Sequence, residues 1–119
     1  MLCITAKGPG LESDVDPRFG RAAYFLFVDP SGALVEALEN HPGGHGAGVN
    51  AAQVVAGRNV TGVITGAVGP NAMRALEAAG IPVHAVSGGT ARAAFEALQA
   101  GGIDQLRGPT SRGHERSGP

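Results

Sequence analysis

Three short loops rich in glycine are the parts of this chain best suited to bind a ligand. They cover residues 41–46, 66–69 and 87–90, and each stands directly before a segment with helical spacing. The first turn of a helix presents unpaired N–H groups and a partial positive charge, and glycine lets an anion approach the backbone. The pattern predicts a site for an anionic ligand, although short turns also use Gly, Ser and Thr for geometry alone.

Two histidines, His41 and His45, lie four residues apart in the first of these loops. Imidazole binds metal ions readily at neutral pH. A closed zinc site usually needs four ligands, and the single cysteine, Cys3, is far away in the sequence. We therefore expect no permanent metal-ion site, but one histidine can donate a single bond to a preassembled cluster. Cys3 lies in a short apolar run and is expected to be a small buried hydrophobic residue.

Four charged residues gather in the segment before the second predicted strand: Asp14, Asp16, Arg18 and Arg21. Local ion pairs and an Asp-Pro turn would explain them. Arginines that contact an anionic ligand would explain them equally well. The sequence leaves both interpretations open.

The charge balance and the motifs that are missing exclude several classes of function. The 119 residues carry 9 Lys and Arg against 10 Asp and Glu, so no basic surface for nucleic acid is expected. The chain has no nucleotide-binding fingerprint, and no acid–base pair or activated nucleophile indicates an enzyme. A single cysteine, no signal peptide and no run of about 18 apolar residues predict a cytoplasmic protein that binds no membrane.

The periodicity of apolar residues predicts an α/β fold that brings two of the loops, 66–69 and 87–90, to the carboxyl ends of parallel strands. Strands that alternate with helices form parallel sheets through right-handed crossovers, and ligands bind at the carboxyl ends of such strands. Residues 1–103 are predicted to form one domain, and residues 104–119, with almost no apolar content, a flexible polar tail. The predicted strands cover residues 2–6, 23–29, 33–39, 60–65 and 81–86, and the predicted helices residues 47–56, 70–79 and 91–100.

Several segments, in order, resemble a known family. They are SDVDPRFGRAAYF at residues 13–25, His-Gly-Ala at 45–47, GVITGAVGPNA at 62–72, Gly-Ile at 80–81 and Ser-Gly-Gly-Thr at 87–90. They are similar to the dinitrogenase iron–molybdenum cofactor family, which includes the carriers NifX and NafY and the C-terminal domain of many NifB proteins. The resemblance implies a ribonuclease-H-like motif with a mixed five-stranded sheet, in which three antiparallel-connected strands precede a βαβα unit. The first strand offers no carboxylate for the two metal ions of a nuclease, so nuclease activity is not expected.

The resemblance also implies a function and a set of site residues. Family members hold preformed anionic metal–sulfur clusters, either iron–molybdenum–sulfur clusters and their precursors or molybdenum–copper sulfide clusters. It implies His45 as the best candidate metal ligand, and His41 is a weaker one. The residues implied to donate hydrogen bonds to the cluster are Arg18, Arg21, Gly66, Gly69, Asn71, Ser87, Gly88, Gly89 and Thr90.

The resulting hypothesis is a non-catalytic carrier that binds such a cluster transiently and uses no nucleotide. Its partners would be the proteins that donate and accept the cluster, and the chain would be a monomer or a weak homodimer. A rival hypothesis is a small regulatory or interaction domain that recognises an ordinary oxyanion or a protein partner through the same loops.

Overall fold

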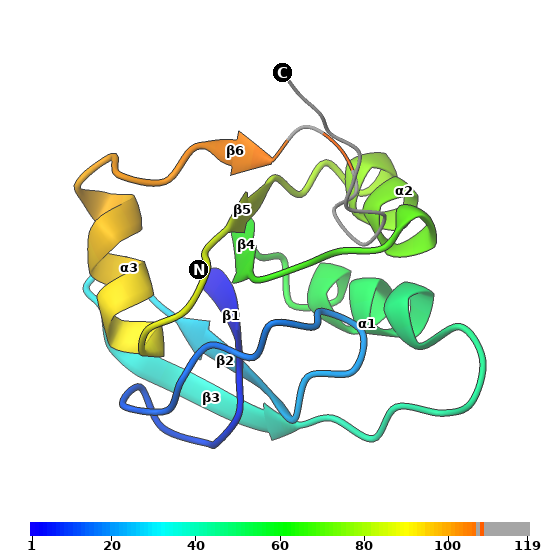
Figure 1. The fold of residues 1–119 in the computed structure, drawn as a ribbon, viewed down its shortest axis with the longest axis horizontal. Coiled ribbons are helices and arrows are strands. Elements are labelled where there is room, and N and C mark those ends of the chain that lie inside the picture. The colour runs from blue at the N-terminus through cyan, green and yellow to red at the C-terminus, as the bar shows by residue number, and fades with distance from the viewer. Residues whose placement is uncertain (107, 109–119) are drawn as a thin grey trace.

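Three helices and a single sheet make up the described part of the chain. A computed structural model of the protein describes residues 1–106 and residue 108, and Figure 1 shows their arrangement. In chain order the elements are β1 (Leu2–Ala6), β2 (Tyr24–Val28), β3 (Leu34–Glu39), α1 (Ala47–Ala56), β4 (Gly62–Thr65), α2 (Pro70–Ala78), β5 (Val83–Ala85), α3 (Ala91–Gln99) and β6 (Gln105–Leu106).

The sheet is mixed and has six strands in the order β3-β2-β1-β4-β5-β6. β1 pairs antiparallel with β2 and parallel with β4, so it joins the hairpin half to the parallel half. The expectation of five strands is wrong, because Gln105 and Leu106 pair antiparallel with β5. This sixth strand lies within the segment predicted to be a tail. The rest of that segment, apart from Asp104 and residue 108, lies outside the described residues.

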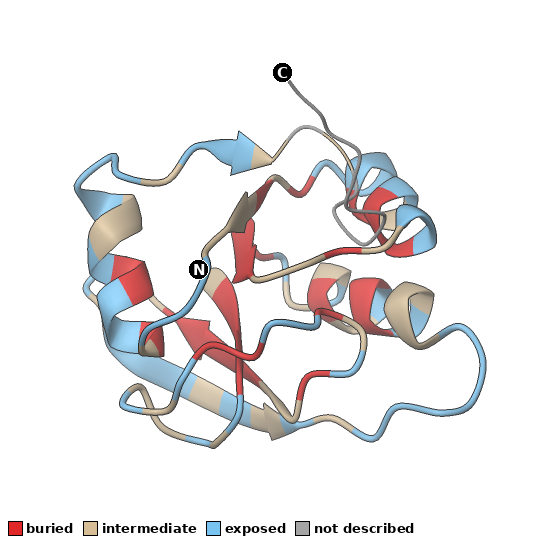
Figure 2. Ribbon diagram, viewed as in Figure 1, coloured by how far each residue is buried: buried red, intermediate tan, exposed pale blue. Residues whose placement is uncertain are grey.

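Both faces of the sheet are covered. Cys3 of β1 belongs to the apolar cluster that includes residues of α1 and α2, whereas its neighbour Ile4 belongs to the cluster that includes Phe95 of α3. Figures 1 and 2 show α3 apart from α1 and α2, with buried segments between them. Strands buried on both faces are apolar at nearly every position, and this explains the continuous apolar runs of β1, β2 and β4.

The outer strand β3 pairs with β2, and Arg58 adds a side-chain contact to it. The guanidinium donates to both carboxylate oxygens of Glu36, at 3.2 and 2.9 Å, and lies over the ring of Phe27 at 5.3 Å from its centroid. These hydrogen bonds from Arg58 lower the pKa of the Glu36 carboxyl. The pairing of β3 with β2 is irregular at Phe27 and Val28, and Leu34 and Val35 are exposed beside it.

The candidate loops share one edge of the sheet, which was predicted for the loops at 66–69 and 87–90. β1, β4 and β5 are parallel, and β1 and β3 both run antiparallel to β2. Because parallel strands end at the same edge, the segments 7–23, 40–46, 66–69 and 86–90 all leave the sheet there. Within the described residues, no helix has the length and apolar character needed to cross a membrane.

Gly66, at the end of β4, allows two of these segments to touch. A Cβ at this position would lie 2.5 Å from Cα and 2.8 Å from the carbonyl oxygen of Pro17. Neither atom can rotate away, since both belong to the backbone. Gly66 is therefore required by packing between the loop after β1 and the loop after β4.

We predict that Gly66→Ala lowers the free energy of unfolding by about 1–3 kcal/mol, because the added methyl group must displace backbone. Urea unfolding monitored by circular dichroism measures the difference. Gly43→Ala is the matched control, since a Cβ at Gly43 meets nothing within 4 Å. Equal stability of the Gly66 variant and the wild-type protein would show that the two loops do not pack as described.

Candidate functional site

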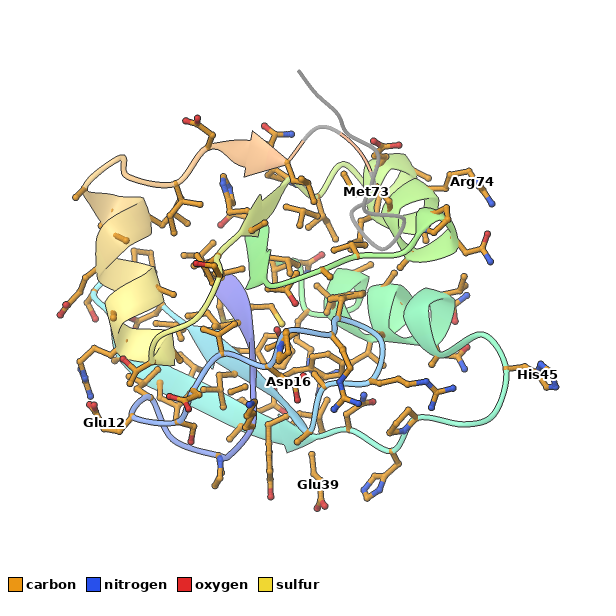
Figure 3. All side chains as sticks on the ribbon, in the orientation of Figure 1. Glu12, Asp16, Glu39, His45, Met73 and Arg74 are labelled. Carbon is orange, nitrogen blue, oxygen red and sulfur yellow. The ribbon has the colours of Figure 1, made fainter. Side chains whose placement is uncertain are left out.

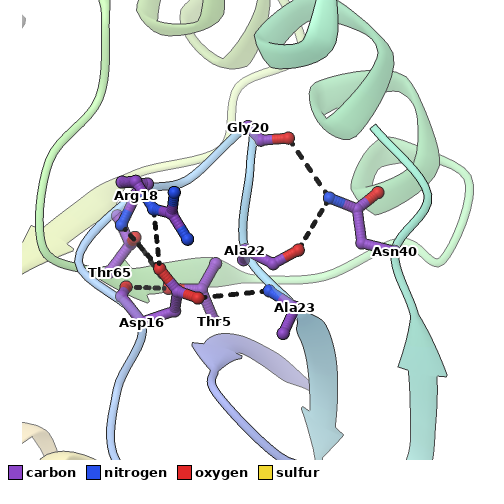
Figure 4. A network of polar contacts seen from close by, with 8 residues as sticks. All are labelled: Thr5, Asp16, Arg18, Gly20, Ala22, Ala23, Asn40 and Thr65. Carbon is purple, nitrogen blue, oxygen red and sulfur yellow. Dashed lines mark hydrogen bonds and ion pairs between the residues drawn. The ribbon is translucent and has the colours of Figure 1, made fainter. Parts of the chain in front are cut away.

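The centre of the candidate site is the segment 16–23, which we call the arginine loop because it carries Arg18 and Arg21. Its path is fixed by Asp16, whose side chain is only 2% exposed. One carboxylate oxygen accepts hydrogen bonds from Arg18 N at 3.1 Å and Arg18 Nε at 3.4 Å, and the other accepts from Ala23 N at 3.2 Å. Figure 4 shows this network. The local ion pairing that the sequence suggested is therefore present for Asp16 and Arg18.

Two further contacts attach the arginine loop to neighbouring segments. The side-chain amide of Asn40 donates to the carbonyl oxygens of Gly20 and Ala22, at 3.2 and 2.9 Å (Figure 4). Phe19 N donates to the carbonyl oxygen of Ala67 at 3.1 Å. Sequence reasoning missed Asn40. The only signal was an amide directly after a strand, which is common at strand ends for other reasons.

A cavity of about 380 Å³ lies between the arginine loop and the beginnings of α1 and α2. This volume is in the range of sites that bind small molecules, about 300–1,000 Å³. The elements around it are in close contact, because a Cβ on Gly20 would lie 2.7 Å from Cα of Gly48, and a Cβ on Gly48 would lie 2.8 Å from Cβ of Ala72. The lining residues are Arg18, Phe19, Gly20, Arg21, Gly48, Ala67, Gly69, Pro70, Asn71 and Ala72.

Two helix N-termini meet at this cavity without a side-chain cap. Gly46 precedes α1 in the left-handed conformation, with φ of 68°, and Gly69 precedes α2 in an extended one. No side chain of the described residues accepts a capping hydrogen bond at either position. Pro70 occupies the first turn of α2, where the missing N–H of proline costs no helical hydrogen bond. The positive ends of both helices, Arg18 and Arg21 bring positive charge to this cavity, and the carboxylate of Asp16 is paired with Arg18 beside it.

The N-terminus of α3 differs from those of α1 and α2, because residues of the protein accept hydrogen bonds from its first N–H groups. Thr90 Oγ1 accepts a hydrogen bond at 3.1 Å from the backbone N–H of Ala93 in the first turn, so Thr90 is the N-cap of this helix. Ala91 N donates to the carbonyl oxygen of Ser13, and Arg92 N donates to that of Leu11, both at 2.9 Å. These N–H groups are thus engaged within the protein.

The structure divides the residues implied to contact the cluster. Four of them, Arg18, Arg21, Gly69 and Asn71, line the 380 Å³ cavity. The three residues Ser87, Gly88 and Gly89 line a smaller cavity of about 190 Å³ together with Lys7 and Asp14. Gly66 packs against Pro17, and Thr90 caps α3.

Both candidate histidines are exposed and line neither cavity. Figure 3 shows His45 at the tip of its loop, directed away from the rest of the protein. Arg21 Nη2 donates to the carbonyl oxygen of Gly44 at 3.4 Å and so connects this loop to the arginine loop. Among the described residues, no three His, Cys, Asp or Glu side chains come together as a group that could hold a metal ion.

Comparisons with known proteins identify the family. Residues 1–107 match the family model described as dinitrogenase iron-molybdenum cofactor. The chain belongs to this family. A search of curated proteins gave no significant match.

Solved structures of similar proteins agree with this assignment. The apo form of the orange protein from Desulfovibrio gigas is 44% identical, with a TM-score of 0.87 over 92% of this chain and 95% of that chain. A candidate NifB protein from Thermotoga is 36% identical, with a TM-score of 0.80 over 94% of this chain and 97% of that chain. Family membership and the mixed α/β fold are therefore both shown.

We predict that Thr90→Ala lowers the free energy of unfolding by about 1 kcal/mol, because it removes the N-cap of α3. Chemical denaturation measures this loss. Ser87→Ala, an exposed hydroxyl in the same loop, serves as the control and should leave stability unchanged. Equal effects of the two substitutions would contradict the assignment of Thr90 as a cap.

Cys3 is fully buried, as predicted, and burial raises the pKa of its thiol. We predict that the native protein does not react with a thiol-specific disulfide reagent at pH 8, because the thiolate does not form. Unfolding in guanidinium chloride should release the single thiol of the chain. Rapid labelling of the native protein would show that β1 opens readily to solvent.

Proposed function

We propose that this protein is a non-catalytic carrier that binds an anionic metal–sulfur cluster in the 380 Å³ cavity. One observation supports the proposal above all others. The N-termini of α1 and α2, which have no side-chain cap, meet Arg18 and Arg21 at one cavity.

The chemistry of the cavity suits a cluster whose surface consists of sulfide. Sulfide ligands carry negative charge and accept hydrogen bonds, so they are complementary to backbone N–H groups and guanidinium. Phe19, Ala67, Pro70 and Ala72 supply apolar walls that fit a large, weakly hydrated anion. N–H donors hold an anion without forming bonds to its metal atoms, and a carrier must release its cargo.

The family description supports the choice of a metal–sulfur cluster as the cargo. It names the iron–molybdenum cofactor of dinitrogenase. We propose an iron–molybdenum–sulfur cluster, or a molybdenum–copper sulfide cluster, as the bound species. His45 would contribute a bond to the metal, which requires its loop to turn toward the cavity.

The proposal extends to the partners, the cellular location and the oligomeric state of the protein. The partners would be the proteins that deliver and receive the cluster, and the carrier would work in the cytoplasm as a monomer or weak homodimer. We propose no enzymatic activity and no nucleotide cofactor.

A second candidate function rests on the 190 Å³ cavity. Lys7 and Ser87 line it together with Gly88 and Gly89, which adopt φ of 156° and 90°. A cationic side chain, a hydroxyl group and glycine backbone suit an ordinary oxyanion such as phosphate. The carboxylate of Asp14 lines the same cavity and opposes an anion, so we rank this function second.

The test is binding of metal by the ligand-free protein under anaerobic conditions. We predict that the protein incubated with tetrathiomolybdate and Cu(I) retains molybdenum through gel filtration, whereas phosphate does not displace it. Arg21→Gln should weaken binding about tenfold, because it removes a charged hydrogen-bond donor from the cavity.

Arg92→Gln makes the same change of charge on α3, where Arg92 pairs with Glu12, and should bind like the wild-type protein. His45→Ala in the same assay measures the contribution of the imidazole. No retained metal in the wild-type protein, or equal binding by the Arg21 and Arg92 variants, would contradict the proposal. Binding of phosphate alone would favour the second candidate.

A further inference from the structure

Asn71 is the one residue lining the 380 Å³ cavity whose side chain can either donate or accept hydrogen bonds. The other polar side chains in the lining belong to Arg18 and Arg21, which carry donors only. Asp16 lies nearby in the arginine loop, but its carboxylate accepts from Arg18 and Ala23. The way in which the Asn71 carboxamide is turned therefore decides whether an acceptor faces the ligand.

A residue outside the cavity lining, Arg74, forms a hydrogen bond with this side chain. Arg74 stands three positions after Asn71 in α2, and residues at this spacing are neighbours on a helix surface. Its Nη2 donates a hydrogen bond to Oδ1 of Asn71. Arginine has no acceptor, so the contact can be made only by the carbonyl oxygen of the amide and not by its nitrogen. Figure 3 shows Arg74 on the outer side of α2.

We propose that Arg74 is a positioning residue that engages the oxygen of the Asn71 carboxamide and leaves its NH₂ group free to donate into the cavity. Every polar side chain that faces the ligand is then a donor. Such a lining favours a ligand with acceptors over its whole surface and negative charge, as in a thiometallate. This inference rests on the proposed function, because it explains how the same cavity selects its cargo.

The contact between Arg74 and Asn71 also predicts which substitution at position 71 weakens ligand binding. Asn71→Asp has nearly the same shape, keeps a partner for Arg74 and adds a carboxylate near the N-terminus of α2, where negative charge is favourable. The variant should therefore fold at least as stably as the wild-type protein. It places an anionic acceptor at the cavity, and we predict that its affinity for tetrathiomolybdate falls at least about tenfold.

A matched pair at position 74 separates orientation from charge. Arg74→Gln and Arg74→Met both remove the positive charge, but only glutamine can still donate to Oδ1 of Asn71. We predict that Arg74→Gln binds tetrathiomolybdate nearly as tightly as the wild-type protein and that Arg74→Met binds it about three- to tenfold more weakly. A purely structural or electrostatic role of Arg74 would give equal affinities for the two variants.

The free protein provides a readout that does not depend on cargo. In ¹H–¹⁵N spectra, the guanidinium signal of Arg74 should shift in Asn71→Ala and stay in place in Asn50→Ala, a control on the exposed surface of α1. An unchanged signal in Asn71→Ala would overturn the inference, as would equal affinities of Asn71→Asp and the wild-type protein, or of the two position-74 variants. Failure of the wild-type protein to bind thiomolybdate, with the Arg74 shift observed, would overturn the proposed function and leave the Asn71–Arg74 contact standing.

Discussion

The buried carboxylate of Asp16 is the interaction on which the candidate site depends. Removing an ionised group from water is costly unless hydrogen bonds and opposite charge replace the lost hydration. Here two backbone N–H groups and the guanidinium of Arg18 surround it. These bonds bend the chain after β1 into the arginine loop, and Asn40 holds the other side of that loop. This one buried charge thus sets the path of the segment that carries Arg18 and Arg21.

The sequence was informative wherever structure is local. Apolar runs and the glycines and prolines around them located β1 to β5 and all three helices, because strand and helix periodicity depend on neighbouring residues. β6 was missed, since Gln105 and Leu106 become a strand only by pairing with β5. Likewise, Gly66 read as part of a ligand-binding loop but serves packing against Pro17. The division of the candidate residues between two cavities depends on contacts across loops, which spacing along the chain does not encode.

The lining of the 380 Å³ cavity offers hydrogen-bond donors and includes no thiolate or imidazole, and this determines which kind of ligand it suits. Thiolates and imidazoles bind individual metal atoms, so they favour permanent sites. Helix N-termini and guanidinium groups recognise the outside of an anion as a whole. Among the helices of the described residues, α1 and α2 have N-termini without a side-chain cap, whereas Thr90, Ser13 and Leu11 accept hydrogen bonds from the start of α3. Under the proposed function, the ligand is a preassembled anion whose whole surface such a cavity could contact.

The contact of Gly20, Gly48 and Ala72 has a consequence for how this architecture can diversify. These residues bring the arginine loop, α1 and α2 as close as atoms without bulky side chains allow, so the spacing of the three elements is set by backbone. Arg18 and Arg21, by contrast, have exposed side chains, where substitutions are tolerated. Substituting them would therefore alter the charge at the cavity and leave its dimensions unchanged. Under the proposed function, the backbone limits the size of the cargo, whereas these side chains set the charge that the cavity favours.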